Sequence, residues 1–69
     1  MRFIKATTTD GQTELFNLEK VLNITPYKTQ TKILMGAGLY WNVYSDSVQV
    51  LDLSANDLEA IIQGGKENA

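Results

Sequence analysis

The amino-acid sequence predicts an α+β domain that is mostly β, with an antiparallel meander of four to five strands and one C-terminal helix. Three observations predict this class. The chain has 69 residues, which is enough for one small domain. Short β-prone runs alternate with turn residues over most of its length, and a helical period replaces them after residue 53. We expect a single domain over residues 1–65 and a frayed tail over residues 66–69.

The first two strands are predicted to form a hairpin. Residues 1–8 begin with apolar side chains and end in threonines that suit a pleated surface. Asp10-Gly11 favours a type I′ turn, which needs positive φ at both central residues. The return strand is expected over about residues 13–18, with alternate apolar side chains on one face.

The next segment, residues 18–24, fits either a short helical stripe or a strand. We favour a short turn near Glu19 and Lys20, followed by a strand over residues 21–28. Pro26 has no N–H to donate, so this strand is expected at a sheet edge. Residues 29–31 are expected to form a polar break.

A second hairpin is predicted around the glycines at positions 36 and 38. Residues 32–35 form its first arm and residues 39–44 its second arm, with Gly36-Ala37-Gly38 as the turn. Alternation along the second arm puts Leu39, Trp41 and Val43 on one face and Tyr40, Asn42 and Tyr44 on the other.

The chain is expected to end in a turn, a strand and a helix. Residues 45–47 form the turn, and residues 48–53 form a strand with its two valines on one face. Ser54 and Asp57 have the spacing of a helix N-terminal capping box. Gly64-Gly65 is expected to end the helix as a C-cap.

Composition excludes several function classes. The chain has no Cys and no His, so it has no thiolate ligand, no thiol nucleophile and no imidazole base. We therefore expect no enzyme, no metal site and no cofactor. The net charge is −2, which disfavours nucleic acid as a partner. No apolar run approaches the ~20 residues of a membrane span. A cytoplasmic protein is expected.

The small size of the chain limits its core. Scaling with mass predicts a folded surface of roughly 4,300 Å² and burial of about 60% of the unfolded surface. A core of that size without disulfides is marginal, and association of copies is a common remedy. A homo-oligomer is therefore one of the expected arrangements.

Two stretches could carry a binding site. The two glycines and adjoining rings of residues 36–41 would let a ligand approach the backbone and stack, or they could be a hairpin turn with core aromatics. The corner at residues 27–32 could hold a phosphate or an acidic partner, or be a solvated hairpin end. Arg2 and Lys5 are added as cations from the first strand. The candidate binding residues are therefore Arg2, Lys5, Tyr27, Lys28, Lys32, Gly36, Gly38, Tyr40 and Trp41.

Charge is unevenly distributed along the chain. Residues 1–32 hold five basic and three acidic groups, whereas residues 33–69 hold one basic and five acidic groups. This asymmetry could steer docking between copies or onto a charged partner, or could arise from the small numbers involved.

The pattern of a glycine turn, an aromatic-led strand and a second glycine hairpin resembles the small FlbD-like bacterial proteins. The matching positions are Gly11, Phe16, Asn17, Ile24, Thr31, Ile33 and Gly38. The order of Asn17 and Leu18 is the reverse of the family pattern, and the segment after Gly38 is longer. The resemblance implies a small non-enzymatic accessory or regulatory protein, and it carries over no catalytic residue.

The sequence thus favours a non-enzymatic regulatory or inhibitory module of a bacterial or phage type. It would bind a protein through an exposed sheet face or edge, with tyrosines or the tryptophan as anchors. The alternative is a homo-oligomer that holds a small nucleotide-like ligand between its subunits.

Overall fold

The structure is a computed structural model that describes residues 1–67. Within them are six strands, one α-helix and two short 3₁₀ helices. The strands are β1 (Arg2–Thr7), β2 (Thr13–Asn17), β3 (Asn23–Tyr27), β4 (Gln30–Gly36), β5 (Leu39–Tyr44) and β6 (Gln49–Asp52). The helices are α1 (Ala55–Glu67) and the 3₁₀ helices η1 (Leu18–Lys20) and η2 (Ser45–Ser47).

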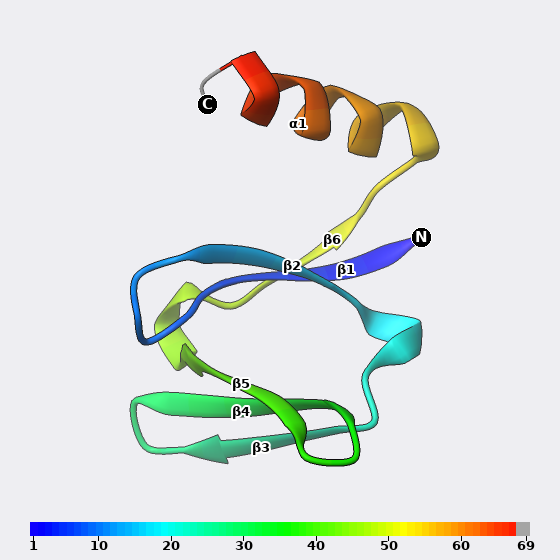
Figure 1. Cartoon of the computed structure of the whole chain (residues 1–69). Helices are drawn as coiled ribbons and strands as arrows, with labels where there is room; N and C mark the ends of the chain where they lie inside the picture. The colour runs from blue at the N-terminus through cyan, green and yellow to red at the C-terminus, as the bar shows by residue number, and fades with distance from the viewer. Residues whose placement is uncertain (68–69) are drawn as a thin grey trace.

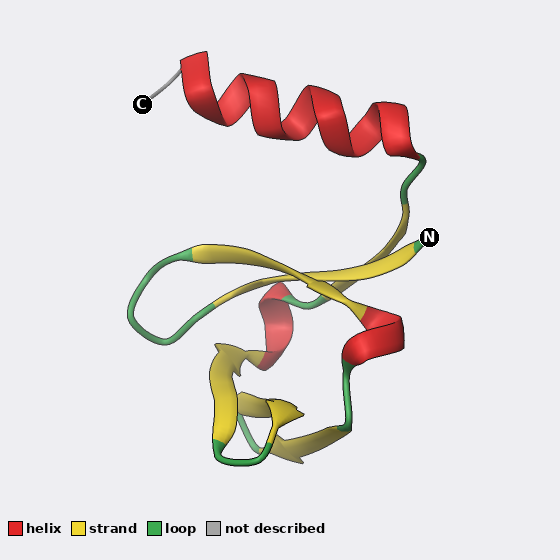
Figure 2. Ribbon diagram, turned by 45° about the vertical axis from the view of Figure 1, so that its right-hand side comes forward, coloured by secondary structure: helices red, strands yellow, loops and turns green. Residues whose placement is uncertain are grey.

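The strands form two small antiparallel sheets. Sheet A has the strand order β2-β1-β6, and sheet B has the order β3-β4-β5. The molecule has three layers, with α1 above sheet A and sheet B below it (Figures 1 and 2). The predicted class is confirmed. The predicted single meander of four to five strands is wrong, because β6 returns to pair with β1 and the six strands divide between two sheets.

The core lies between the inner faces of the two sheets. Its buried members are Ile4, Ala6 and Phe16 from sheet A and Ile33 and Val43 from sheet B. Burial of each large aliphatic side chain contributes about 1.5–3 kcal/mol. Trp41 closes one side of this core, since its ring meets that of Phe16 edge to face at a centroid distance of 5.5 Å.

A seam at the end of β1 joins the two sheets. Thr8 is 5% exposed and forms an isolated bridge to Val43 of β5. The next amide, that of Thr9, donates to the carbonyl of Asn42 at 3.0 Å. The Thr8 hydroxyl accepts from the amide of Gln12 at 3.1 Å, which ties the β1–β2 loop to the same point.

The β1–β2 turn differs from the expected type. Gly11 has a φ of +94°, but Asp10 is not among the residues with positive φ, so the type I′ prediction is wrong. The connection is a loop of residues 8–12, closed by a bond from the Thr8 amide to the Gln12 carbonyl at 2.7 Å. The Gly11 amide donates to the Thr8 carbonyl at 2.9 Å, so residues 8–11 form a turn in which only Gly11 has positive φ. Glycine adopts that conformation without the steric cost that Asp10 would meet.

The middle of the chain follows the prediction more closely. The turn at residues 18–20 is present as η1, and β3 with its proline lies at an edge of sheet B. The expected polar break at residues 29–31 is wrong, because the turn is Lys28-Thr29 and β4 already begins at Gln30. Thr31 is 8% exposed and its hydroxyl lies 2.7 Å from that of Ser45, so this polar residue is part of the interior.

The second hairpin forms as expected, with Gly38 at a φ of +70° in its turn. In the last strand, Val50 lies opposite the buried Ile4 and therefore on the inner side of sheet A. It is nevertheless 61% exposed, because β6 is an edge strand that sheet B does not cover.

Helix α1 begins with the predicted capping box. The Ser54 hydroxyl accepts from the Asp57 amide at 3.1 Å, and the Asp57 carboxylate accepts from the Ser54 amide at 2.9 Å. The predicted C-cap at Gly64-Gly65 is wrong, because neither glycine has positive φ and the helix runs to Glu67. Of the expected tail, residues 66 and 67 belong to α1, and residues 68–69 lie outside the described residues.

The helix stands off from the two sheets (Figure 1). The accessible surface of the chain is 5061 Å², against roughly 4,300 Å² for a compact chain of this mass. The radius of gyration is 12.5 Å, whereas a compact domain of this length has about 11 Å. We attribute the extra surface to α1, because this helix is joined to β6 by a short connection and packs only loosely against sheet A.

The capping box makes the helix sensitive to acid. Hydrogen bonds from the backbone and side chain of Ser54 lower the pKa of Asp57 below its ordinary value of 3.8. This contribution to helix stability is therefore present above pH 3.8 and is lost as the pH falls through the lowered folded-state pKa. We expect far-ultraviolet circular dichroism to show α1 fraying at that acidic end. In Asp57→Asn the helix signal should depend less on pH, and an unchanged pH dependence would contradict this origin.

Two glycine substitutions should have opposite effects. A Cβ added at Gly64 or at Gly38 meets nothing within 4 Å, so only backbone conformation distinguishes the two sites. Gly64→Ala should stabilise the helix by about 0.5–1 kcal/mol, since alanine is the better helix former. Gly38→Ala should destabilise the domain by about 1–2 kcal/mol, because its positive φ disfavours a side chain. Thermal unfolding of both variants tests this, and effects of the same sign would contradict the assigned helix end.

Candidate functional site

The outer face of sheet B gathers side chains from all three of its strands. The register places them in three cross-strand rows, because paired residues share a face. The rows are Asn23–Leu34–Tyr40, Thr25–Lys32–Asn42 and Tyr27–Gln30–Tyr44. We call these nine residues the tyrosine face.

Three exposed rings mark both ends of the tyrosine face. Tyr27 is 53% exposed, Tyr40 is 51% exposed and Tyr44 is 41% exposed. Between them lies Lys32, whose Nζ is 5.5 Å from the centroid of the Tyr40 ring. Attraction between the Lys32 ammonium group and the Tyr40 ring favours this position of the ammonium group. The side of the ammonium group that points away from the ring can still bind an acidic group of a partner.

The tyrosine face carries positive charge and no carboxylate. Residues 21–45 contain two lysines and neither Asp nor Glu, although the whole chain has a net charge of −2. The second of these cations, Lys28, sits in the β3–β4 turn with a φ of +27°. Two shallow hollows of about 240 and 310 Å³ flank this turn, with Tyr44 and Asp46 beside one and Tyr27 beside the other.

The seam holds the tyrosine face in place from one side. The Tyr44 hydroxyl donates to the carbonyl of Thr9 at 3.3 Å, and the Thr9 amide donates to the carbonyl of Asn42. The loop after β1 therefore braces two residues of the face from sheet A. A ring held in this way loses less conformational freedom when it binds a partner.

The structure separates the predicted site residues into groups. Tyr27, Lys32 and Tyr40 come together on the tyrosine face, and Lys28 lies in the adjoining turn. Trp41 lies on the opposite, inner side and packs against Phe16.

The remaining predicted residues lie away from the tyrosine face. Arg2 and Lys5 are on β1 of sheet A. Gly38 supplies positive φ to the hairpin turn, while Gly36 ends β4 and its Cβ position would meet only Leu39 at 3.7 Å. These two glycines serve the turn and form no cradle for a ligand.

Alternation placed Asn42 and Tyr44 beside Tyr40, and Tyr44 was among the tyrosines expected to anchor a protein, but the list of candidate binding residues contained neither. It also missed the β3 and β4 members of the tyrosine face, which are Asn23, Thr25, Gln30 and Leu34. Alternation within each strand was the available signal. The register between strands, which decides what lies beside what, is fixed by the two-residue turns and by the bulge near Gly36.

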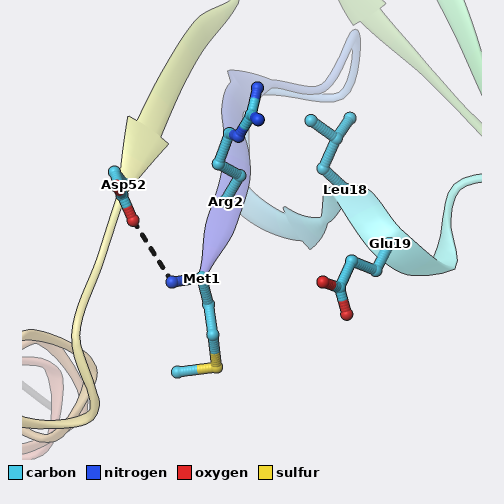
Figure 3. Close-up of a pocket in the computed structure, with 5 residues that line it drawn as sticks. All are labelled: Met1, Arg2, Leu18, Glu19 and Asp52. Carbon is cyan, nitrogen blue, oxygen red and sulfur yellow. Dashed lines mark hydrogen bonds and ion pairs between the residues drawn. The ribbon is translucent and has the colours of Figure 1, made fainter.

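The hollow at the start of β1 is a charged cleft of about 490 Å³ (Figure 3). The amino group of Met1 donates to Oδ1 of Asp52 at 3.2 Å and to the carbonyl of Leu53 at 3.0 Å. Arg2 and Glu19 also line it. Two cations and two carboxylates balance one another there, so this cleft has no net attraction for a charged ligand.

Other kinds of site are absent from the described part of the chain. Residues 1–67 contain no group of three carboxylate, imidazole or thiol side chains placed to hold a metal ion. No helix within that range is long and apolar enough to cross a membrane. Comparison with known proteins found no matching family model, no matching curated protein and no matching solved structure.

Neighbouring aromatic residues of β5 should respond differently to truncation. Trp41→Ala removes a ring that packs on the core, so we expect a loss of about 3 kcal/mol in the free energy of unfolding. Tyr40→Ala removes an exposed ring and should cost less than about 1 kcal/mol. Urea unfolding of both variants measures the difference. Equal losses would contradict the assignment of the two rings to opposite sides of sheet B.

Proposed function

We propose that this chain is a non-enzymatic module that binds a protein through the tyrosine face and thereby regulates or inhibits that protein. The observation that carries the proposal is three half-exposed tyrosines on one sheet face, with Lys32 between them and no carboxylate. Tyrosine is enriched at protein interfaces because it buries a large area with only two side-chain torsions to fix.

The composition of the tyrosine face supports a protein partner of polar or acidic surface. Lys32 can approach a carboxylate while its ammonium group stays over the Tyr40 ring, and the amides of Asn23, Gln30 and Asn42 offer both donors and acceptors. Such a face suits a flat surface better than a small molecule, since the adjoining hollows are shallow and lie at one end.

Pairing at the edge of sheet B is the weaker way to bind a protein. β3 is one edge of the sheet, and Pro26 stands near its middle without an N–H to donate. β5 is the other edge, and its Val43 is already bridged to Thr8. An added strand would lose a ladder bond at Pro26. The proposal therefore assigns recognition to the side chains of the face and not to the backbone of the edge.

The resemblance to the FlbD-like proteins points in the same direction, since it implies a small accessory or regulatory protein. The proposal places the chain in the cytoplasm, because a chain without cysteine has no disulfide to gain elsewhere.

Removal of the three rings should abolish partner binding without unfolding the domain. The test variant combines Tyr27→Ser, Tyr40→Ser and Tyr44→Ser. The matched control combines Leu22→Ser and Val50→Ser, which removes exposed apolar side chains outside the tyrosine face. Immobilised wild type and control should retain the same protein from a lysate of the natural host, and the triple variant should lose it at least tenfold by quantitative mass spectrometry.

Two outcomes would overturn the proposal. A protein retained equally by the triple variant would place the binding surface elsewhere. A chain that retains no protein, but whose melting temperature rises with one compound of a nucleotide panel, would favour the alternative of a nucleotide-like ligand. Within the proposal, Lys32→Glu should weaken binding more than Lys32→Ala, because it adds repulsion against an acidic partner.

A further inference from the structure

A second, mostly apolar cleft lies on the side of the molecule away from the tyrosine face. It opens between α1 and the outer face of sheet A and has a volume of about 570 Å³. Sheet A contributes four of its lining residues and α1 contributes two. They are Lys5, Thr13, Leu15, Leu51, Ile61 and Gly65. Protein interiors are close-packed, whereas the apolar side chains that line this cleft lack packing partners on one side. Binding of an apolar group in the cleft would therefore stabilise it.

Helix α1 has apolar side chains next to the cleft that no other part of the chain covers fully. Ile61 is 45% exposed and Ile62 is 60% exposed. An isolated helix of 13 residues that includes two glycines is not stable in water, and such helices depend on packing of their apolar side. The body of the same chain supplies only part of that packing.

We infer that a second copy of this chain fills the cleft, and that it does so with Ile62 of its own α1. The cleft is smaller than two turns of a helix about 10 Å across, so no whole helix enters it. It does accommodate a few aliphatic side chains projected from a helix that lies along its mouth. Ile62 is the most exposed large apolar side chain of α1, and it is therefore the one available for insertion.

Charge complementarity supports the same partner. Among residues 1–65, Lys5 is the one charged residue that lines the cleft, and it has no ion pair within that range. Glu59 precedes Ile62 by three residues and therefore shares its side of the helix. Its carboxylate is exposed, and among residues 1–65 its one bonding partner is the side-chain amide of Gln63 at 3.3 Å. Insertion of Ile62 thus brings the Glu59 carboxylate of one copy to Lys5 of the other.

The surface area has the right size for such an interface. The chain exposes roughly 760 Å² more than a compact chain of its mass. A standard interface buries about 800 Å² on each partner. Exchange of the same two surfaces between two copies closes a two-fold dimer, in which each cleft receives the other copy's helix. Both tyrosine faces stay free, so the inference does not depend on the proposed function.

Reversal of the two charges provides the sharpest test. Wild type should have twice the chain mass of 7.7 kDa in sedimentation equilibrium at micromolar concentration. Lys5→Glu and Glu59→Lys should each weaken dimerisation at least tenfold. The double variant should restore it, and so should a mixture of the two single variants. All these residues are exposed, so none of the substitutions removes a core contact.

Ile62→Asn should also give a monomer, and Leu22→Asn is its matched control. Leu22 is 66% exposed but lies next to sheet B, so its loss should leave the dimer intact. A monomer at every concentration would overturn the inference. So would a dimer that survives Ile62→Asn, a double charge variant that is no better than the single ones, or a monomer that carries a small molecule in native mass spectrometry.

Discussion

The fold depends on the seam at Thr8, where the end of β1 stays bonded to the β1–β2 loop and also joins sheet B. Up to Thr7, β1 pairs with β2; at Thr8 it bridges to Val43, and at Thr9 it donates to Asn42. Without this link the chain would be two separate three-stranded sheets, and three-stranded sheets of this size have little core of their own. The seam makes their inner faces into one interior around Ile33 and Val43, which are almost fully buried.

The same constraint decides which surfaces remain for binding. Because the inner side of sheet B is committed to the core, the alternate residues of β3, β4 and β5 must face outward, and they include all three tyrosines. The outer side of sheet A is only partly covered by α1, which leaves a cleft beside an uncovered isoleucine. One outer surface is thus the one we propose for a protein partner, and the other is the one we propose for a second copy.

Local features of the fold could be predicted from the sequence because they depend on neighbouring residues. The capping box of Ser54 and Asp57, the Gly38 turn and the edge position of Pro26 each follow from the chemistry of a few adjacent groups.

Two kinds of feature could not be predicted: the backbone conformation at Asp10-Gly11 and Gly64-Gly65, and the features that depend on distant pairing. Asp10-Gly11 does lie in a tight turn, closed by the bond from the Gly11 amide to the Thr8 carbonyl, but Asp10 lacks the positive φ of the predicted turn type. Gly64-Gly65 reads as a helix end, yet both glycines continue the helix. Alternation showed that Tyr40 and Trp41 point to opposite sides of a strand. It did not show which side sheet A would cover, and it could not place Tyr27 beside Tyr44.

The most direct test of the account is hydrogen exchange of the Thr9 amide in the folded chain. Thr9 lies in a loop by its position in the sequence, and only the bond to Asn42 across the seam should protect its amide. If the two sheets form one unit, this amide should exchange as slowly as the amides of β4 and β5. An exchange rate like that of Gly11 or other loop residues would mean that the sheets open independently, and it would contradict the account of both outer surfaces.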